Sequence, residues 1–325
     1  MWGVMMKITR VQVAAAPTPM AGLALGIASL GWCWENAFPL QGVAQLSSAM
    51  LASVLLLILL TKFVMHPHLL LADLKHPVVG SVVPTFAMAT MVVSKALGMH
   101  MPLLGQGLWL AAVALHVIFL LMFLWHRLRV FEVQHLLPSW FVPPVGIIVA
   151  AVATPGGDWL PLSHALLWMG LCSYAVMLPV MLYRLIFCGE VVDASKPTIA
   201  ILAAPASLSL AGYLTLTAEP SLLLVALLFG IAVLMTALIY LAFFRLLRLP
   251  FSPGYAAFTF PLVISATAQY KVAALLHQWP FSQDYVAQIR LLASGELLMA
   301  TLAVGYVMLR YALHYLLPAR PLVTA

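Results

Sequence analysis

The sequence predicts an all-α integral membrane protein with ten transmembrane helices arranged as five helical hairpins. Three observations predict this class. The 325 residues are 64% hydrophobic and only 7% charged, whereas a soluble domain carries roughly 25% charged residues. Apolar segments of membrane-spanning length follow one another with short connections. A proline also opens every second segment at a nearly constant spacing.

The apolar segments fill the chain and leave no room for a second domain. At roughly 20 residues per span, ten spans take up about 200 residues, and the remainder suffices for short loops. We therefore expect one transmembrane domain, with a short cytoplasmic N-terminus at 1–16, a ten-helix bundle at 17–316 and a cytoplasmic tail at 317–325. The expected helices are 17–35, 42–65, 77–97, 103–126, 138–154, 162–187, 197–216, 221–246, 253–276 and 286–316.

The prolines at the starts of the odd-numbered segments form a repeat. They are separated by 58, 61, 59 and 56 residues. A near-constant period of this kind is typical of stacked supersecondary units, and the unit here is a helical hairpin. The five opening prolines are Pro19, Pro77, Pro138, Pro197 and Pro253.

A second proline, or a glycine in the first repeat, follows five to eight residues into each odd-numbered segment. A proline inside a helix removes a backbone hydrogen bond and clashes with the carbonyl four residues back, so the helix kinks. In a bilayer the freed backbone must face protein or a water-filled cavity. We therefore expect five kinked inner helices that line a pore, ringed by five straighter outer helices. The expected kinks are at Gly26, Pro84, Pro143, Pro144, Pro205 and Pro261.

Lysine and arginine fix the expected orientation, because cytoplasmic loops carry an excess of both. Twelve of the fifteen fall on one predicted side, so we expect that side and both termini to be cytoplasmic, in the bacterial inner (plasma) membrane. We expect the stretch 66–76 on this side, with its histidines, to be a solvated loop. The twelve cations are Lys7, Arg10, Lys62, Lys75, Arg127, Arg129, Arg184, Lys196, Arg245, Arg248, Arg310 and Arg320.

The ninth segment carries the most specific pattern. Pro261 lies inside it, and the bulky Phe260 comes directly before the expected kink. Phe258 and Phe260 are two residues apart, so on a helix they point about 200° from each other. Only one of the two rings can therefore face a pore.

Residues 257–261 (AFTFP) and 265–267 (SAT) resemble the ninth helix of the tellurite-resistance/dicarboxylate transporter family. That family includes TehA-like bacterial proteins and the plant guard-cell slow anion channels. Residues 17–26, 34–39, 76–77, 138–143 and 203–206 resemble other helix starts, turns and kinks of the same family, in order and spacing. Some bacterial members have glycine after the phenylalanine, whereas this chain has Pro261, as the plant channels do.

The resemblance implies a site, a substrate class and an assembly. In the family a phenylalanine on this helix plugs a central pore, so Phe260 is the expected gate. The implied partners are small inorganic or organic anions, the lipid bilayer and two further copies of the chain in a homotrimer. Small residues on outer helices, such as Gly170 and Gly230, would permit close contact between subunits.

Polar residues beyond the expected gate are further candidates for the pore wall. Ser265 and Thr267 could donate to a dehydrated anion or satisfy backbone carbonyls of their own helix. Lys271 lies about 16 Å beyond Phe260 at 1.5 Å per residue. It could attract anions into the lumen, or snorkel to the membrane surface. The sequence leaves the roles of His116, Glu296 and Arg290 open.

The function that follows is a gated channel, or channel-like transporter, for small anions such as chloride or nitrate. The alternative is a proton-coupled carrier or exporter of C4-dicarboxylate, sulfite or tellurite-related anions. Such a carrier needs a titrating group at the membrane midplane, for which only His116 and Glu296 are available. The sequence carries no enzyme motif, and we expect no cofactor, no metal and no nucleic-acid partner.

Overall fold

The structure is a computed structural model that describes residues 13–278 and 283–315. All regular secondary structure in these residues is helical, which confirms the all-α class for this part of the chain. The expected tail at 317–325, most of the expected N-terminus at 1–16, and the cations Lys7, Arg10 and Arg320 lie outside the described residues.

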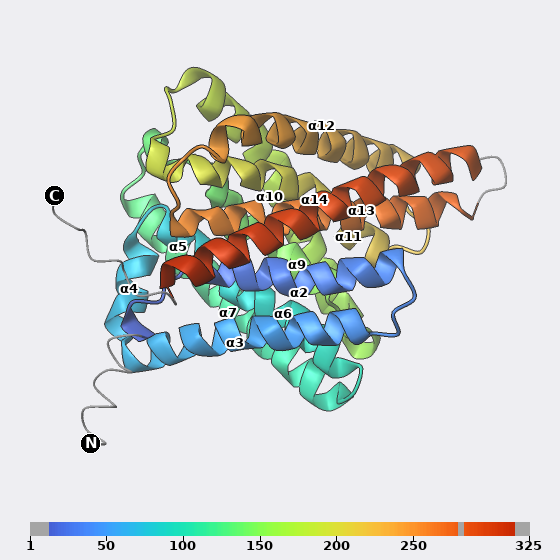
Figure 1. The fold of residues 1–325 in the computed structure, drawn as a ribbon, viewed down its shortest axis with the longest axis horizontal. Helices are drawn as coiled ribbons and strands as arrows, with labels where there is room; N and C mark the ends of the chain where they lie inside the picture. Colours follow the sequence, from blue (N-terminus) through green and yellow to red (C-terminus); the bar gives the residue numbers. More distant parts are fainter. Residues whose placement is uncertain (1–12, 279–282, 316–325) are drawn as a thin grey trace.

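The helices run roughly parallel or antiparallel to one long axis, and the chain passes repeatedly from one end of the molecule to the other (Figure 1). In the labels of Figure 1, α denotes α-helices, and η denotes the short 3₁₀ helices. In chain order they are α2 (Met20–Ala37), α3 (Val43–Met65), α4 (Pro67–Lys75), α5 (Val79–Val82), α6 (Thr85–Gly98), α7 (Pro102–Arg129), η1 (Val133–His135), η2 (Pro138–Phe141), α8 (Val142–Val145), η3 (Gly146–Ile148), α9 (Val149–Val152), η4 (Gly157–Trp159), α10 (Leu160–Phe187), η5 (Asp193–Ala203), α11 (Ala204–Leu216), α12 (Leu222–Leu246), η6 (Pro253–Phe258), α13 (Phe260–Leu276) and α14 (Gln283–Tyr315).

Eight helical stretches in the described residues are long and apolar enough to cross a membrane. Pro138–Val152 is a shorter apolar stretch of the same kind. Every expected segment of the sequence contains helix, including 17–35, where α2 carries the polar pair Glu35 and Asn36 in its last turn.

Burial divides these stretches into two groups. In the most apolar windows of Val79–Gly98, Asp193–Leu216 and Pro253–Leu276, 72% of the residues are buried. In the other five the share is 28–39%. Because an outer helix buries only the face that it turns to its neighbours, the two levels separate inner from outer helices. The more buried stretches are odd-numbered segments of the sequence, and the less buried ones are the even-numbered segments.

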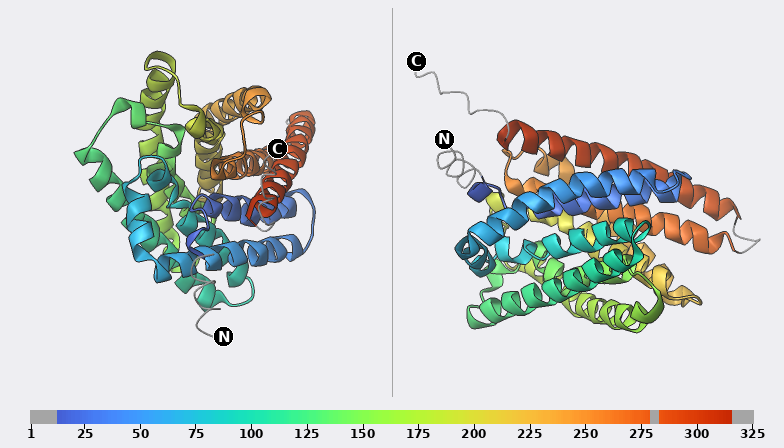
Figure 2. Two further views of the ribbon diagram at one scale, coloured as in Figure 1. Left: turned by 60° about the vertical axis from the view of Figure 1, so that its left-hand side comes forward. Right: turned by 90° about the horizontal axis from the view of Figure 1, so that it is seen from below.

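The inner helices close into a ring. α2 packs against α6 and α13, α11 packs against α13 and α9, and α9 packs against α6. Outer helices lie beside the inner helices that precede them, α3 along α2, α7 along α6 and α14 along α13. The neighbouring blue helices α2 and α3 can be followed in Figure 1 and in the right view of Figure 2.

Prolines interrupt the inner segments where the sequence predicts kinks. Pro84 separates α5 from α6, Pro143 and Pro144 lie in the one-turn α8, and Pro205 and Pro261 lie in the first turns of α11 and α13. In the first turn of a helix a missing amide proton costs nothing, so each break falls just before its proline. The expected kink at Gly26 is absent, since α2 continues through this residue without a break.

Two further expectations from the sequence are wrong. Residues 67–75 form the helix α4 and not a loop, and its Leu74 is only 1% exposed against Val83 and Phe119. Gly170 is buried inside the chain, where a side chain would collide with Ile148, so it offers no surface to another subunit. Gly230 is exposed with open space around it.

Candidate functional site: a central cavity at the helix breaks

A cavity of about 520 Å³ lies inside the ring of inner helices, at the end of the molecule that carries the arginine-rich connections. We call it the vestibule. It extends from the exposed His76 at its mouth to buried residues at its inner end. All five inner segments contribute to that inner end, through Leu25, Met88, Gly146, Leu208 and Phe260.

Beyond these residues the inner helices pack closely. Met91, Ile148 and Leu210, each one turn or less further along its segment, are fully buried. Phe260 is thus one of the buried side chains at the inner end of the vestibule.

Phe260 occupies its position because of the break in the ninth segment. The 3₁₀ helix η6 ends at Phe258, and α13 begins at Phe260 with Pro261 in its first turn. Phe260 is 7% exposed and lines the vestibule. Phe258 is 1% exposed and packs on Phe243 and Tyr255, with ring centroids at 5.3 and 4.8 Å. The two rings thus point to different sides of the segment.

Gly26 allows residues 259–260 to come this close to α2. A Cβ atom at Gly26 would collide with the side chain of Thr259 and lie 3.2 Å from the amide nitrogen of Phe260. The Thr259 hydroxyl also donates to the carbonyl of Gly22 at 3.2 Å. The glycine of the first repeat is therefore a packing site for residues 259–260.

A side-chain donor caps a carbonyl at each of the four proline breaks. Two of the four accepting residues, Val82 and Ala256, line the vestibule, whereas Pro143 and Ala203 do not. The four bonds are Thr85 Oγ1 to Val82 O at 2.6 Å, His116 Nε2 to Pro143 O at 2.8 Å, Ser207 Oγ to Ala203 O at 2.9 Å and Thr259 Oγ1 to Ala256 O at 2.7 Å.

The polar candidates on α13 lie away from the vestibule. Ser265 shares a 2.8 Å hydrogen bond with Thr236 of the outer helix α12. Thr267 donates to Val263 O of its own helix at 2.9 Å. Both hydroxyls thus serve contacts between or within helices. The Ser252 side chain, at the start of η6, makes no capping hydrogen bond and lines the vestibule.

Lys271 lies at the opposite end of the molecule, beside a second lysine. Its ammonium is 5.7 Å from the centroid of the Trp32 ring, and that of Lys95 is 4.2 Å from the same ring. Lys95 also donates to Val152 O at 2.8 Å and lines a separate cavity of about 200 Å³. Lys95 and Lys271 each follow the opening proline of their segment by 18 residues. That shared offset was the signal in the sequence for this pair.

The three residues whose roles the sequence leaves open are now placed. His116 is fully buried on α7, behind the vestibule wall. Glu296 is 5% exposed on α14, and its nearest polar neighbours are Ser265 and Gln269 on α13. Arg290 is exposed on the same helix. None of the three lines the vestibule.

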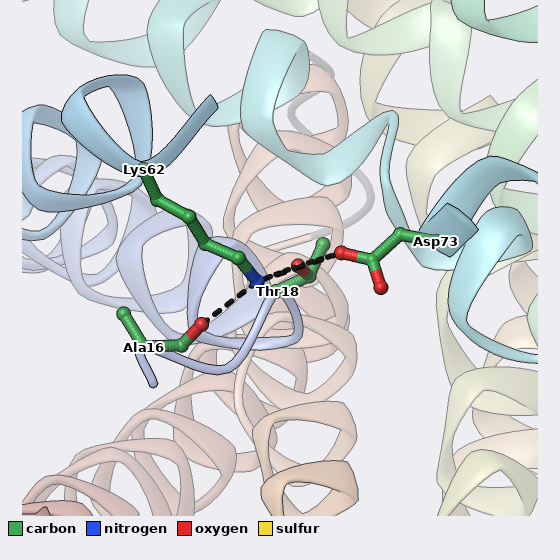
Figure 3. A network of polar contacts seen from close by, with 4 residues as sticks. All are labelled: Ala16, Thr18, Lys62 and Asp73. Carbon is green, nitrogen blue, oxygen red and sulfur yellow. Dashed lines mark hydrogen bonds and ion pairs between the residues drawn. The ribbon is translucent and has the colours of Figure 1, made fainter. Parts of the chain in front are cut away.

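A charged network lies at the mouth of the vestibule (Figure 3). The ammonium of Lys62, at the end of α3, donates to Ala16 O at 2.9 Å and to Thr18 Oγ1 at 3.0 Å. It also forms a 3.5 Å ion pair with Asp73 of α4. Thr18 in turn donates to Asp73 Oδ2 at 2.5 Å. The network joins the segment before α2, the end of α3 and α4.

Comparison with known proteins identifies relatives of the chain. Residues 17–312 match the family described as SLAC1, voltage-dependent anion channel. The chain is 26% identical over 251 residues to the "Uncharacterized transporter MJ0762" of Methanocaldococcus jannaschii, covering 67% of this chain and 72% of that protein. It is 27% identical over 231 residues to the "Uncharacterized transporter MJ0576" of the same organism, covering 62% and 66%.

Proposed function

This chain belongs to the SLAC1 family of voltage-dependent anion channels, and from that premise we propose that it is a gated channel or channel-like transporter for small anions, closed by the side chain of Phe260. The observation that carries the proposal is the vestibule, on which all five inner segments converge and at whose inner end Phe260 lies. An ion cannot shed its hydration against a ring that offers no replacement ligands. Phe260 would therefore block permeation both by its volume and by excluding water.

The capped carbonyls support an anion as the permeating ion. Potassium-selective filters coordinate their ions with backbone carbonyl oxygens, and here Thr85 and Thr259 donate to the carbonyls of the lining residues Val82 and Ala256. Lys95 and Lys271, at the far end, would add a positive field there. Together these features disfavour cations along the proposed path and accommodate small anions such as chloride or nitrate.

The positions of the buried titratable groups favour a channel over a proton-coupled carrier. A carrier needs its titrating group at the substrate site. His116 lies behind the wall and donates to a backbone carbonyl, and Glu296 lies between α13 and α14. Neither lines the vestibule. Phe260 is instead the feature of the path that could control an uncoupled flow.

The proposed setting is a bacterial inner membrane that the chain crosses ten times, as five hairpins with both termini cytoplasmic. α2 and Pro138–Val152 would supply the two spans beyond the eight identified by length and composition. The vestibule would then open to the cytoplasm, because it lies at the arginine-rich end. We propose a homotrimer with one pore in each subunit, joined through the exposed apolar faces of the outer helices.

Recording from purified protein in planar bilayers tests the function. We expect discrete openings, with a reversal potential that follows the chloride or nitrate gradient and ignores the cation gradient. A saturable flux that moves protons with C4-dicarboxylate or sulfite, without discrete openings, would instead establish the carrier. The proposal fails if the currents follow the cation gradient.

A further inference from the structure

We propose that Asp73 sets the electrostatic potential of the vestibule by neutralising Lys62, and thereby limits how strongly the vestibule concentrates anions. This inference rests on the proposed function, because it assigns a residue that tunes the entry of the permeating ion. It concerns the charge of the mouth and is independent of the gate at Phe260.

The charge inventory of the vestibule wall motivates the proposal. Among the described lining residues, Lys62 and Asp73 are the two with a lysine, arginine, aspartate or glutamate side chain, and His76 is the further titratable one. An anion path with a single lysine at its mouth would gather anions through that lysine. Here the ion pair with Asp73 brings the sum of the two charges to zero.

The carboxylate of Asp73 is more exposed to water than the ammonium of Lys62. The Lys62 side chain is 7% exposed and surrounded by three oxygen partners, whereas that of Asp73 is 24% exposed. Both the hydroxyl of Thr18 and the ammonium of Lys62 approach Asp73 Oδ2, and the second oxygen takes part in neither contact (Figure 3). An anion at the mouth therefore meets the negative member of the pair first.

Asp73 is not needed as an anchor for α4, because other contacts hold this helix. Leu74 is buried in an apolar cluster, and Arg127 of α7 donates to the carbonyl of Lys75. An asparagine at position 73 keeps an oxygen that can accept the Thr18 hydroxyl. Asp73→Asn therefore changes the charge of the mouth while leaving its geometry supported.

The expected effect of one unit charge is moderate and measurable. A charge about 10 Å away in a largely aqueous cavity changes the local concentration of a monovalent ion about twofold before screening. The ratio of anion to cation concentrations then changes up to about fourfold. Salt screens this effect, since the Debye length falls from about 30 Å at 0.01 M to about 3 Å at 1 M. A purely structural role for Asp73 has no such salt dependence.

A thiol probe measures this potential without any need for permeation. Ser252→Cys places the probe in the vestibule, in a full-length chain whose Cys33, Cys172 and Cys188 are replaced by serine. The rates of modification by a negatively and a positively charged methanethiosulfonate reagent are compared in four versions: Asp73 and Lys62 intact, Asp73→Asn, Lys62→Gln, and both substitutions together. Glu132→Gln is the control, because its exposed pair with His135 lies outside the vestibule.

We expect the ratio of anionic to cationic reagent rates to rise up to about fourfold in Asp73→Asn at 0.01 M salt and to fall in Lys62→Gln. The double variant should return to the starting ratio, and Glu132→Gln should leave it unchanged. In bilayers at low salt, anion conductance should be higher in Asp73→Asn and lower in Lys62→Gln than in the unsubstituted protein. At 1 M salt the conductances of the variants should become equal. Should Lys62→Gln not fold, Asp73→Asn with its salt dependence decides the test.

An unchanged ratio in Asp73→Asn overturns the inference, and so does a shift of both single variants in the same direction. The thiol rates also separate its failure from that of the proposed function. A shifted ratio in a protein that passes no anions would leave the charge assignment standing and remove the channel. Anion currents together with an unshifted ratio would support the channel and remove the charge assignment of Asp73.

Discussion

Single side chains donate hydrogen bonds to carbonyls at the proline breaks, and two of those carbonyls, of Val82 and Ala256, belong to residues of the vestibule wall. Thr85, Ser207 and Thr259 each donate to a carbonyl three or four residues back, and His116 reaches Pro143 from an outer helix. Hydroxyls commonly bond to carbonyls of their own helix, so these bonds are ordinary locally. We propose that the two caps at the vestibule wall, on Val82 O and Ala256 O, reduce the negative potential that these carbonyls present to an ion.

Removal of one cap tests that role. Thr85→Val keeps the shape of the side chain but leaves Val82 O without its donor, and Thr85 lines the vestibule. We expect a lower anion-to-cation permeability ratio from reversal potentials, and a loss of about 1–3 kcal/mol in stability from the unsatisfied carbonyl. Thr215→Val removes the same kind of bond far from the vestibule and should leave the ratio unchanged. Equal ratios in the two variants would remove the capping role.

Gly26 gives a second prediction at this scale. Gly26→Ala brings a Cβ atom into Thr259, so overpacking should cost about 1–3 kcal/mol, seen as a lower thermal unfolding temperature in detergent. Gly230→Ala is the matched control, because open space surrounds that helical glycine and alanine favours the helix by about 1 kcal/mol. Equal stability of the Gly26→Ala variant and the unsubstituted protein would contradict the contact.

At the scale of the elements, the sequence predicts helix positions well because proline has a local and strict effect. The repeat of opening and second prolines locates the breaks before Pro84, Pro205 and Pro261. Glycine has no such fixed consequence, so the role of Gly26 depended on a partner more than 230 residues away. The inward position of Gly170 could not be predicted either, because it also depends on a partner in another segment, Ile148.

The direction of a side chain could be predicted only where it depends on the spacing of residues along one helix. The opposite directions of Phe258 and Phe260 follow from their spacing, and the structure places them accordingly. The polar partners of Ser265, Lys62 and Asp73 come from other elements, so composition and spacing within one segment could not identify them. The short helix α4 was missed because it is too brief to give a hydrophobic period.

The orientation of the elements is the third prediction. The connections near Arg127, Arg184 and Arg245 should face the cytoplasm, and those near Asp158 and Glu219 the periplasm. Single cysteines placed in each connection of a cysteine-free variant, treated in intact cells with a membrane-impermeant thiol reagent, report the side. Labelling at Asp158 and Glu219 but not at the arginine connections is the expected result. The reverse pattern would invert the protein and place the vestibule mouth outside.

At the scale of the whole molecule, the described outer helices expose a wide apolar surface. Leu223 is 82% exposed and Leu241 65% exposed on α12, on the outside of the ring. Lipid can cover such faces, and so can other subunits that approach through small residues such as Gly230. We expect a homotrimer in native mass spectrometry from a mild detergent. A spectrum dominated by monomer over a range of protein concentrations would contradict it.

The central claim is that Phe260 closes an anion path, and one paired measurement tests it most directly. Phe260→Ala and Phe258→Ala are compared for anion conductance in bilayers and for thermal stability. Loss of the Phe260 ring should leave the fold intact and raise conductance about tenfold or more, since each 1.4 kcal/mol removed from a barrier gives about that factor. Phe258→Ala should leave conductance low and cost about 3–5 kcal/mol of stability, because its ring is packed against Phe243 and Tyr255. If Phe260→Ala destabilises the protein without raising the current, or if Phe258→Ala is the conducting variant, Phe260 is not the gate.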